Sequence, residues 1–262
     1  MTAHPAHERT TVRWTSAAVE AAREAVAPEG ARDWFLDAVD GGLALHTVVR
    51  RWSQADEPSA RLVRLACGTA LYAARLAVAV HGRRPVVTSS TTPGVVAVLR
   101  AGASTAASPV QRAAYAALRR GGPADVQAPP SAVAVLRYLR RAADSEGARL
   151  SEILLHPGPE LGPRWPGSAV SDSGFTHPDA TPTLLLGAPG RSPWAEVQTG
   201  QALEAVVLAA GAAGLQACVL AAPADPGALA GRLVPEQWTG WGAAPVVLRV
   251  GPARPVGSGR TD

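Results

Sequence analysis

Arginine side chains are the residues of this chain that are best suited to bind a charged ligand. The sequence holds 25 basic residues and no lysine, so every permanent side-chain positive charge is a guanidinium group. Arg119 and Arg120 stand at the end of a predicted helix, and Arg249 lies in the apolar run VVLRVG. A guanidinium group binds phosphate or carboxylate through paired hydrogen bonds. The pattern therefore indicates a site for an anionic small molecule, with phosphates as the best match.

Each of these arginines also has a purely structural interpretation. The carbonyl groups and the dipole at the C-terminal end of a helix favour cations, which accounts for Arg119 and Arg120 without a ligand. Arg249 needs an anionic partner if it points into the protein, and it needs none if it points outward from its strand. Both interpretations stay open for all three residues.

The standard catalytic motifs are absent from the sequence. The lack of lysine excludes a P-loop and a Schiff-base enzyme, and no GxGxxG, HExxH, CxxC or GxSxG pattern is present. The histidines are isolated from one another and from carboxylates, so no metal site is predicted. Cys67 and Cys218 lie in apolar stretches that are typical of buried thiols. No residue stands out as catalytic.

Charge and hydrophobicity favour a soluble, cytoplasmic protein. The net charge of +4 is spread over many segments, with no basic block interleaved with aromatic residues, which argues against nucleic-acid binding. The first 14 residues lack the apolar core of a signal peptide. The longest apolar run, 205–215, is shorter than the roughly 18 residues that cross a bilayer. We expect a monomer or a homodimer with no membrane partner.

The element expected to position the rest of the chain is a long helix between residues 56 and 85. Asp56 can cap its start. Arg61, Arg64 and Arg75 fall on one narrow stripe, and apolar residues cover the remaining circumference. A helix that is apolar on most sides is buried, and only such a stripe reaches solvent or an anion. This helix is therefore predicted to be the centre of an α+β domain.

The remaining elements suggest two similar halves. Serines mark the starts of four more helices, and the turn Asp40-Gly41-Gly42 predicts a hairpin. The helix after Ser192 is apolar all round in its second half and occupies a place like that of the 56–85 segment, which indicates a weak internal duplication. We expect loose ends at 1–14 and 253–262, and one domain over 15–252 with halves of about 15–105 and 106–252.

Two blocks of sequence resemble the Acg-like branch of the nitroreductase superfamily. The first, at 60–87, reads ARLVRLACGTALYAARLAVAVHGRRPVV and ends its helix in Gly-Arg-Arg-Pro. The second, at 182–220, reads PTLLLGAPGRSPWAEVQTGQALEAVVLAAGAAGLQACVL and is followed by PVVLRVG. The predicted hairpin VDGGLALHTVVRR fits the same branch. The resemblance covers most of residues 16–252.

The resemblance implies an FMN-binding α+β fold, with a mixed sheet and long buried helices, in which two pseudo-repeated halves imitate the nitroreductase dimer. It implies electron transfer from NAD(P)H to an organic acceptor, with the cofactor supplying the chemistry. Alternatives stay open for several candidates, since the glutamine can face solvent and the tryptophans can be core residues. The candidate cofactor-binding residues are Arg119, Arg120, Arg249, Gln201, Trp34, Trp194 and Gly214.

The chain departs from the family where the flavin is bound. Segment 27–34 keeps little more than its Trp, and 119–123 keeps only an arginine pair of the family's phosphate loop. Segment 217–221 lacks the family's Ser-Pro-Leu-x-Gln, and 156–180 is short. Two functions therefore stay open: an FMN-dependent oxidoreductase, or a non-catalytic protein of the same fold that either holds flavin or has lost it.

Overall fold

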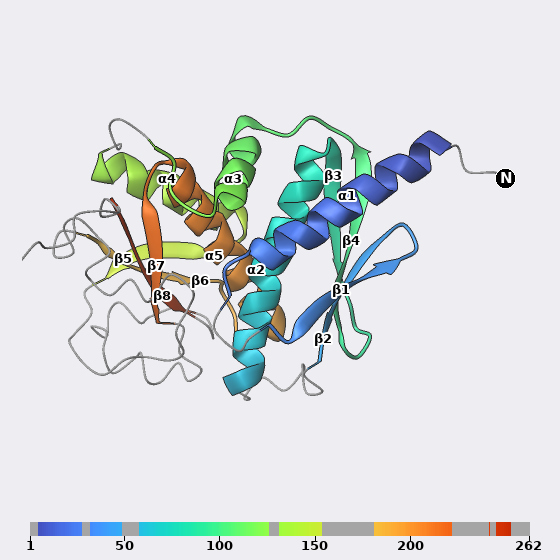
Figure 1. The fold of residues 1–262 in the computed structure, drawn as a ribbon. Helices are drawn as coiled ribbons and strands as arrows, with labels where there is room; N and C mark the ends of the chain where they lie inside the picture. Colours follow the sequence, from blue (N-terminus) through green and yellow to red (C-terminus); the bar gives the residue numbers. More distant parts are fainter. Residues whose placement is uncertain are drawn as a thin grey trace, which may run out of the picture.

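The computed structural model describes residues 5–27, 32–48, 58–125, 131–153, 181–221, 241 and 245–252. This part of the chain forms five helices and two four-stranded antiparallel sheets, which confirms the α+β class. The two sheets lie on opposite sides of a central group of helices (Figure 1). The expected tail 253–262 and the segment 156–180 lie outside the described residues.

In the first half, a long helix lies along the chain between the first pair of strands and the second pair. The sheet of this half has the order β1-β2-β4-β3, and every neighbouring pair is antiparallel. The turn at Asp40 and Gly41 joins the first two strands, as predicted. The elements are α1 (Pro5–Glu24), β1 (Trp34–Val39), β2 (Gly42–Thr47), α2 (Pro58–Val80), β3 (Arg83–Ser89) and β4 (Val95–Ser104).

The second sheet has the same strand order as the first. Its order is β5-β6-β8-β7, so that in both halves the strands follow the order first, second, fourth, third. Again a long helix lies along the chain between the first pair of strands and the second pair. The elements are α3 (Pro109–Arg120), α4 (Ala132–Ser145), β5 (Arg149–Ile153), β6 (Thr183–Gly187), α5 (Pro193–Ala212), β7 (Gln216–Ala221) and β8 (Val246–Gly251).

The expected mixed sheet is wrong for the described strands. All six pairings are antiparallel, and they fall into two separate sheets rather than one. A parallel pair needs a crossover connection, whereas β1–β2 and β3–β4 are joined by short turns that allow only antiparallel neighbours. The long helix in each half connects the second strand to the third, and these two strands are not neighbours in the sheet.

The N-terminal helix is longer than the sequence suggested. It begins at Pro5, inside the segment 1–14 that was expected to be loose. The reason is visible at Trp14, which is buried in the core together with Ala18 and Ala21 of the same helix. Burial of a large aromatic side chain stabilises the turns around it.

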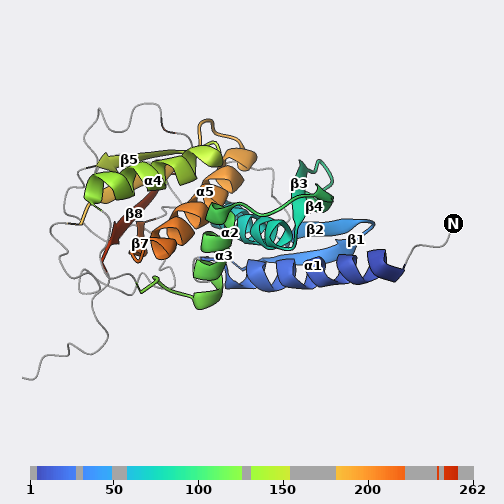
Figure 2. The same ribbon diagram turned by 90° about the horizontal axis from the view of Figure 1, so that it is seen from above.

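The predicted central helix is confirmed as α2. It is long and apolar enough to cross a membrane by composition, but 83% of its Ala60–Val80 segment is buried inside the protein. It packs against α1, α3 and α5 (Figure 2). We therefore regard α2 as a core helix of the fold.

Helices α2 and α5 make the most extensive helix contact in the described structure. They cross where Gly68 meets Gly200. A Cβ atom placed on Gly200 would overlap the carbonyl oxygen of Leu65 and lie 2.9 Å from the Gly68 Cα. A Cβ on Gly68 would in turn overlap the Val197 carbonyl oxygen and lie 2.8 Å from the Gly200 Cα. The two backbones thus touch, and glycine is the residue that allows this close approach.

Candidate functional site

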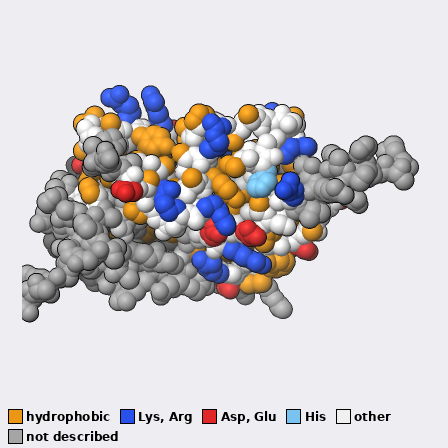
Figure 3. Space-filling view, turned by 45° about the horizontal axis from the view of Figure 1, so that its top comes forward, with side chains coloured by type: hydrophobic (Ala, Val, Ile, Leu, Met, Phe, Trp, Pro, Cys, Tyr) orange, Lys and Arg blue, Asp and Glu red, His pale blue; other side chains and the backbone are white. Residues whose placement is uncertain are grey.

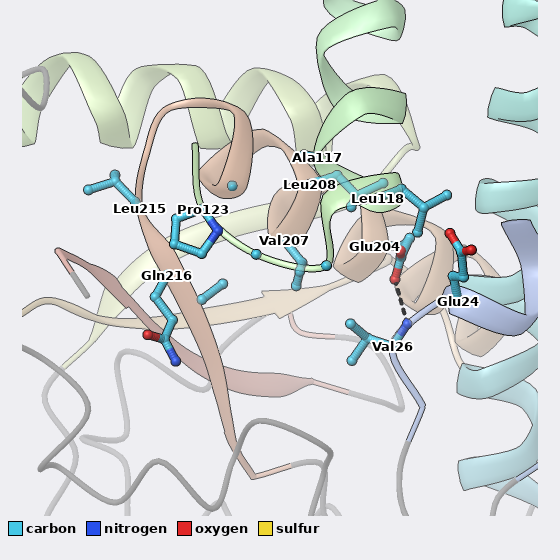
Figure 4. A pocket seen from close by; sticks show the side chains of 14 residues that line it. Glu24, Val26, Ala117, Leu118, Pro123, Glu204, Val207, Leu208, Leu215 and Gln216 are labelled. Atoms are coloured by element: carbon cyan, nitrogen blue, oxygen red, sulfur yellow. Dashed lines mark hydrogen bonds between the residues drawn. The ribbon is translucent and has the colours of Figure 1, made fainter. Parts of the chain in front are cut away.

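A cavity of about 300 Å³ lies where the second half meets the end of α1 (Figure 4). We call it the Glu204 cavity. Its walls come from the end of α1 and the residues after it, the C-terminal end of α3, the middle of α5 and the start of β7. Most of its lining is apolar or glycine, and the polar side chains are those of Glu24, Glu204 and Gln216. The apolar lining includes Val26, Ala117, Leu118, Pro123, Val207, Leu208, Leu215 and Ala217.

Two glycines with positive φ shape this cavity. Gly121 has φ 69° and ends α3 with its N–H bonded to the carbonyl oxygens of Ala117 and Leu118. Gly214 has φ 76° and ends α5, after which Leu215 leads into β7. Because glycine adopts the left-handed conformation without strain, both helices can stop at the cavity and let the chain turn around its wall.

Glu204 is the most unusual group in the cavity wall. Its side chain is fully buried, and its Oε2 accepts a hydrogen bond of 3.0 Å from the backbone N–H of Val26. Its Oε1 has no hydrogen-bond partner among the described residues. Burial raises the pKa of Glu204 to about 8, against the opposing effect of the Val26 hydrogen bond. At neutral pH the group is therefore mainly a carboxylic acid.

The predicted phosphate pair lies beside the cavity but is already engaged. Arg119 Nη1 donates to Glu24 Oε1 and lies 3.9 Å from Glu20 Oε2. Arg120 Nε donates to the carbonyl oxygen of Gly122 at 3.2 Å. Neither arginine is in the described lining, but each bonds a lining residue, Arg119 to Glu24 and Arg120 to Gly122. In this arrangement the charge of Arg119 is neutralised by carboxylates of α1.

The other predicted cofactor residues lie elsewhere, except for Gly214, which adjoins the cavity through Leu215. Gln201 accepts a hydrogen bond of 2.7 Å from Arg75 Nη1, and Arg249 Nε donates to Thr183 Oγ1 at 3.3 Å. Trp34 lines a separate hollow of about 190 Å³, and its indole N–H is buried without a described partner. Trp194 packs against the core of the first half. The described structure does not bring the seven residues into one site.

The arginine stripe of α2 meets carboxylates instead of solvent. Arg64 is fully buried and its Nε donates to Glu196 Oε2 on α5, while Arg61 lies 4.0 Å from the other oxygen of the same carboxylate. Arg75 Nη1 donates to Glu146 Oε2 at 2.5 Å. The Glu196 pairs join α2 to α5, and the Glu146 pair joins α2 to the end of α4. The stripe was visible in the sequence, but its partners were not.

FMN is the cofactor that the sequence resemblance implies, and its phosphate group sets the main requirement for a site. A flavin phosphate is a dianion and needs cationic or N–H donors when it is buried. The described lining of the cavity holds two acidic side chains, Glu24 and Glu204, and Arg119 is paired with Glu24. On the face seen in Figure 3, basic side chains are scattered among acidic and apolar ones. The described lining of the cavity includes no cationic side chain, so it does not fit the phosphate of FMN while Arg119 stays paired with Glu24.

Both cysteines are expected to resist modification in the folded protein. Cys67 and Cys218 are buried, and burial raises the pKa of the Cys67 thiol far above its ordinary value despite the opposing charge of Arg64. The thiolate is the reactive form. We expect a thiol reagent to label neither residue under native conditions and both after unfolding in guanidinium chloride. Fast labelling of either thiol in the native protein would contradict this structural role.

No protein-family model matches this chain, and no curated protein matches it in sequence.

Proposed function

We propose that this chain is a small-molecule-binding protein on a nitroreductase-like scaffold, and that the Glu204 cavity is its binding site. The observation that carries the proposal is the cavity itself, which has apolar walls and a single buried, partly unsatisfied polar group, Glu204. Cavities of this size with few, well-placed polar groups are the usual form of a small-molecule site.

Support for the nitroreductase-like scaffold comes from the two sequence blocks and from the repeated topology. Each half has the same strand order around a long helix, and the two long helices cross in the middle of the molecule. Such an arrangement suits a chain in which two halves imitate a dimer. The scaffold is a proposal of fold kinship and does not by itself assign an activity.

The second candidate is an FMN-dependent oxidoreductase that passes electrons from NAD(P)H to an organic acceptor. It is favoured by the sequence resemblance and by the position of Arg119 and Arg120 beside the cavity. It requires that Arg119 exchange Glu24 for a phosphate group. The ion pair between these exposed side chains is weak enough for such an exchange, so the two candidates are separated by experiment.

The purified full-length chain is expected to lack flavin absorbance, and added FMN is expected to keep its free fluorescence. Replacing Arg119 and Arg120 together with alanine should leave both results unchanged. If the phosphate used this pair, the double variant would lose charge-assisted hydrogen bonds of about 1.5–3 kcal/mol each. A yellow wild-type protein whose affinity for FMN falls roughly thirtyfold or more in the double variant would instead establish the oxidoreductase candidate.

A further inference from the structure

We propose that the Glu204 cavity binds an uncharged molecule with an apolar body and one hydrogen-bond acceptor, such as a ketone or an ester, and that the carboxylic acid O–H of Glu204 donates a hydrogen bond to that acceptor. This inference rests on the proposed function, because it names the class of ligand that the same cavity would take.

The two oxygens of Glu204 have different surroundings. Oε2 accepts the N–H of Val26 at 3.0 Å, so the proton of the acid belongs on Oε1. Oε1 is buried and has no partner among the described residues. A buried polar group without a partner is costly, and nearly all such groups in folded proteins are satisfied. An acceptor atom of a ligand would satisfy this O–H group if the side chains that cover Oε1 moved to admit it.

The walls around Glu204 suit the apolar part of such a ligand. Figure 4 shows Val207 and Leu208 of α5, Leu118 of α3 and Val26 around the carboxyl group, with Leu215 toward the other end of the cavity. These side chains offer no hydrogen bonds to a polar body. They favour a small aromatic or aliphatic group, whose transfer from water releases the free energy of apolar burial.

The charges near Glu204 disfavour an ionic ligand. The end of α1 contributes Glu24, which is neutralised by Arg119 of α3. Helix α2 brings Tyr72 within electrostatic reach, and burial raises the pKa of its hydroxyl above the ordinary value, which keeps it neutral. Gln216 of β7 is uncharged. An anion would therefore find no cationic side chain among the described residues of the lining, and a cation would meet a protonated, uncharged Glu204.

Three probes of nearly equal size test the inference: acetophenone, 1-phenylethylamine and ethylbenzene. Each is titrated into the ¹⁵N-labelled full-length protein, with the backbone amide of Val26 as the reporter, because that N–H bonds Glu204 directly. We expect acetophenone to bind about tenfold more tightly than ethylbenzene, the effect of one hydrogen bond. Its affinity should fall as the pH rises past about 8, because ionised Glu204 has no proton to donate.

Two variants at the same position sharpen the test. Glu204→Gln keeps a donor in its amide group and should retain the preference for the ketone, whereas Glu204→Met lacks a donor and should lose it. If the methionine variant does not fold, the two ligands acetophenone and ethylbenzene are compared on the wild-type protein below and above pH 8. The preference for the ketone should then disappear at high pH, where Glu204 has lost its proton. Tighter binding of the amine, abolished in Glu204→Gln, would overturn the inference in favour of a cation site.

The remaining outcomes separate this inference from the proposed function. Equal binding of acetophenone and ethylbenzene, lost when Val207→Trp fills the cavity, would overturn the role of Glu204 and leave the cavity as a binding site. If none of the three probes shifts the Val26 amide at any pH, the proposed function fails together with the inference.

Discussion

Replacing Gly200 with alanine is expected to lower the free energy of unfolding by about 3 kcal/mol or more. The new methyl group would overlap the Leu65 carbonyl oxygen and crowd the Gly68 Cα, both of which are backbone atoms of α2. Backbone atoms cannot rotate away, so α2 and α5 would have to separate along their contact. The midpoint of unfolding in urea, measured on the purified variant, reports this loss.

Gly211→Ala is the matched control, because it lies on the same helix. A Cβ atom there would meet the Ala117 Cβ at 3.4 Å, an ordinary contact. Alanine is favoured over glycine in a helix by about 1 kcal/mol, so this variant should unfold at the same urea concentration as the wild type or a higher one. If Gly200→Ala were as stable as Gly211→Ala, the close crossing of α2 and α5 would be wrong.

Gly68→Ala should have an effect similar to that of Gly200→Ala, since its methyl group would overlap the Val197 carbonyl oxygen. The double variant should lose less than the sum of the two single losses, because one separation of the helices relieves both overlaps. Neighbouring sites that share a backbone shift are coupled in this way. Strict additivity would indicate that the two glycines act at independent places.

Local signals in the sequence predicted most of the elements. Ser108, Ser131 and Ser192 each accept a hydrogen bond from the N–H three residues later, as expected of N-caps. The turn at Asp40-Gly41 and the buried helix α2 were also predictable, because turn residues and apolar periodicity act within a few residues. The start of α1 was missed because its anchor, Trp14, depends on burial against the distant helix α2.

The candidate site depends on contacts that the sequence does not encode locally. The arginine stripe on α2 was evident, but Glu196 and Glu146, its partners, are 132 and 71 residues away from Arg64 and Arg75. Glu204 was visible only as one acid at the start of an apolar run, a pattern that fits an exposed position equally well. Its burial follows from the packing of α2 and α3 on α5 and from the segment after α1, where Val26 bonds it, which is a tertiary property. The close approach of Gly68 to Gly200 cannot be predicted from the sequence either, because it also depends on how two distant helices pack.

Glu204 is expected to make the protein less stable as the pH rises from about 4.5 to about 8. Burial raises its pKa in the folded protein to about 8, from an ordinary value of 4.5. Below pH 4.5 the group is protonated in both the folded and the unfolded chain, so it has no effect. Between the two values the unfolded chain releases the proton while the folded protein retains it, and ionisation stabilises only the unfolded chain. Above pH 8 the penalty is complete and constant.

The slope of this loss is at most about 1.4 kcal/mol per pH unit, so the whole window represents a loss of several kcal/mol. Other groups titrate in the same range, and we therefore compare the wild type with Glu204→Gln. The glutamine side chain does not titrate, and its carbonyl oxygen can still accept the N–H of Val26. The difference in unfolding free energy between the variant and the wild type should shift in favour of the variant by several kcal/mol from pH 5 to pH 8.

The control for this experiment is Glu152→Gln, which changes an exposed glutamate at the end of β5. It removes the same charge from the chain without touching the cavity, so its unfolding free energy should run parallel to that of the wild type over the whole pH range. Urea unfolding at pH 5, 6, 7 and 8 for the three proteins measures both differences. If Glu204→Gln also ran parallel to the wild type, Glu204 would have to be ionised in the folded protein at pH 7. It would then be no proton donor to a ligand at neutral pH, and the ligand class proposed for the cavity would be wrong along with the predicted pH dependence.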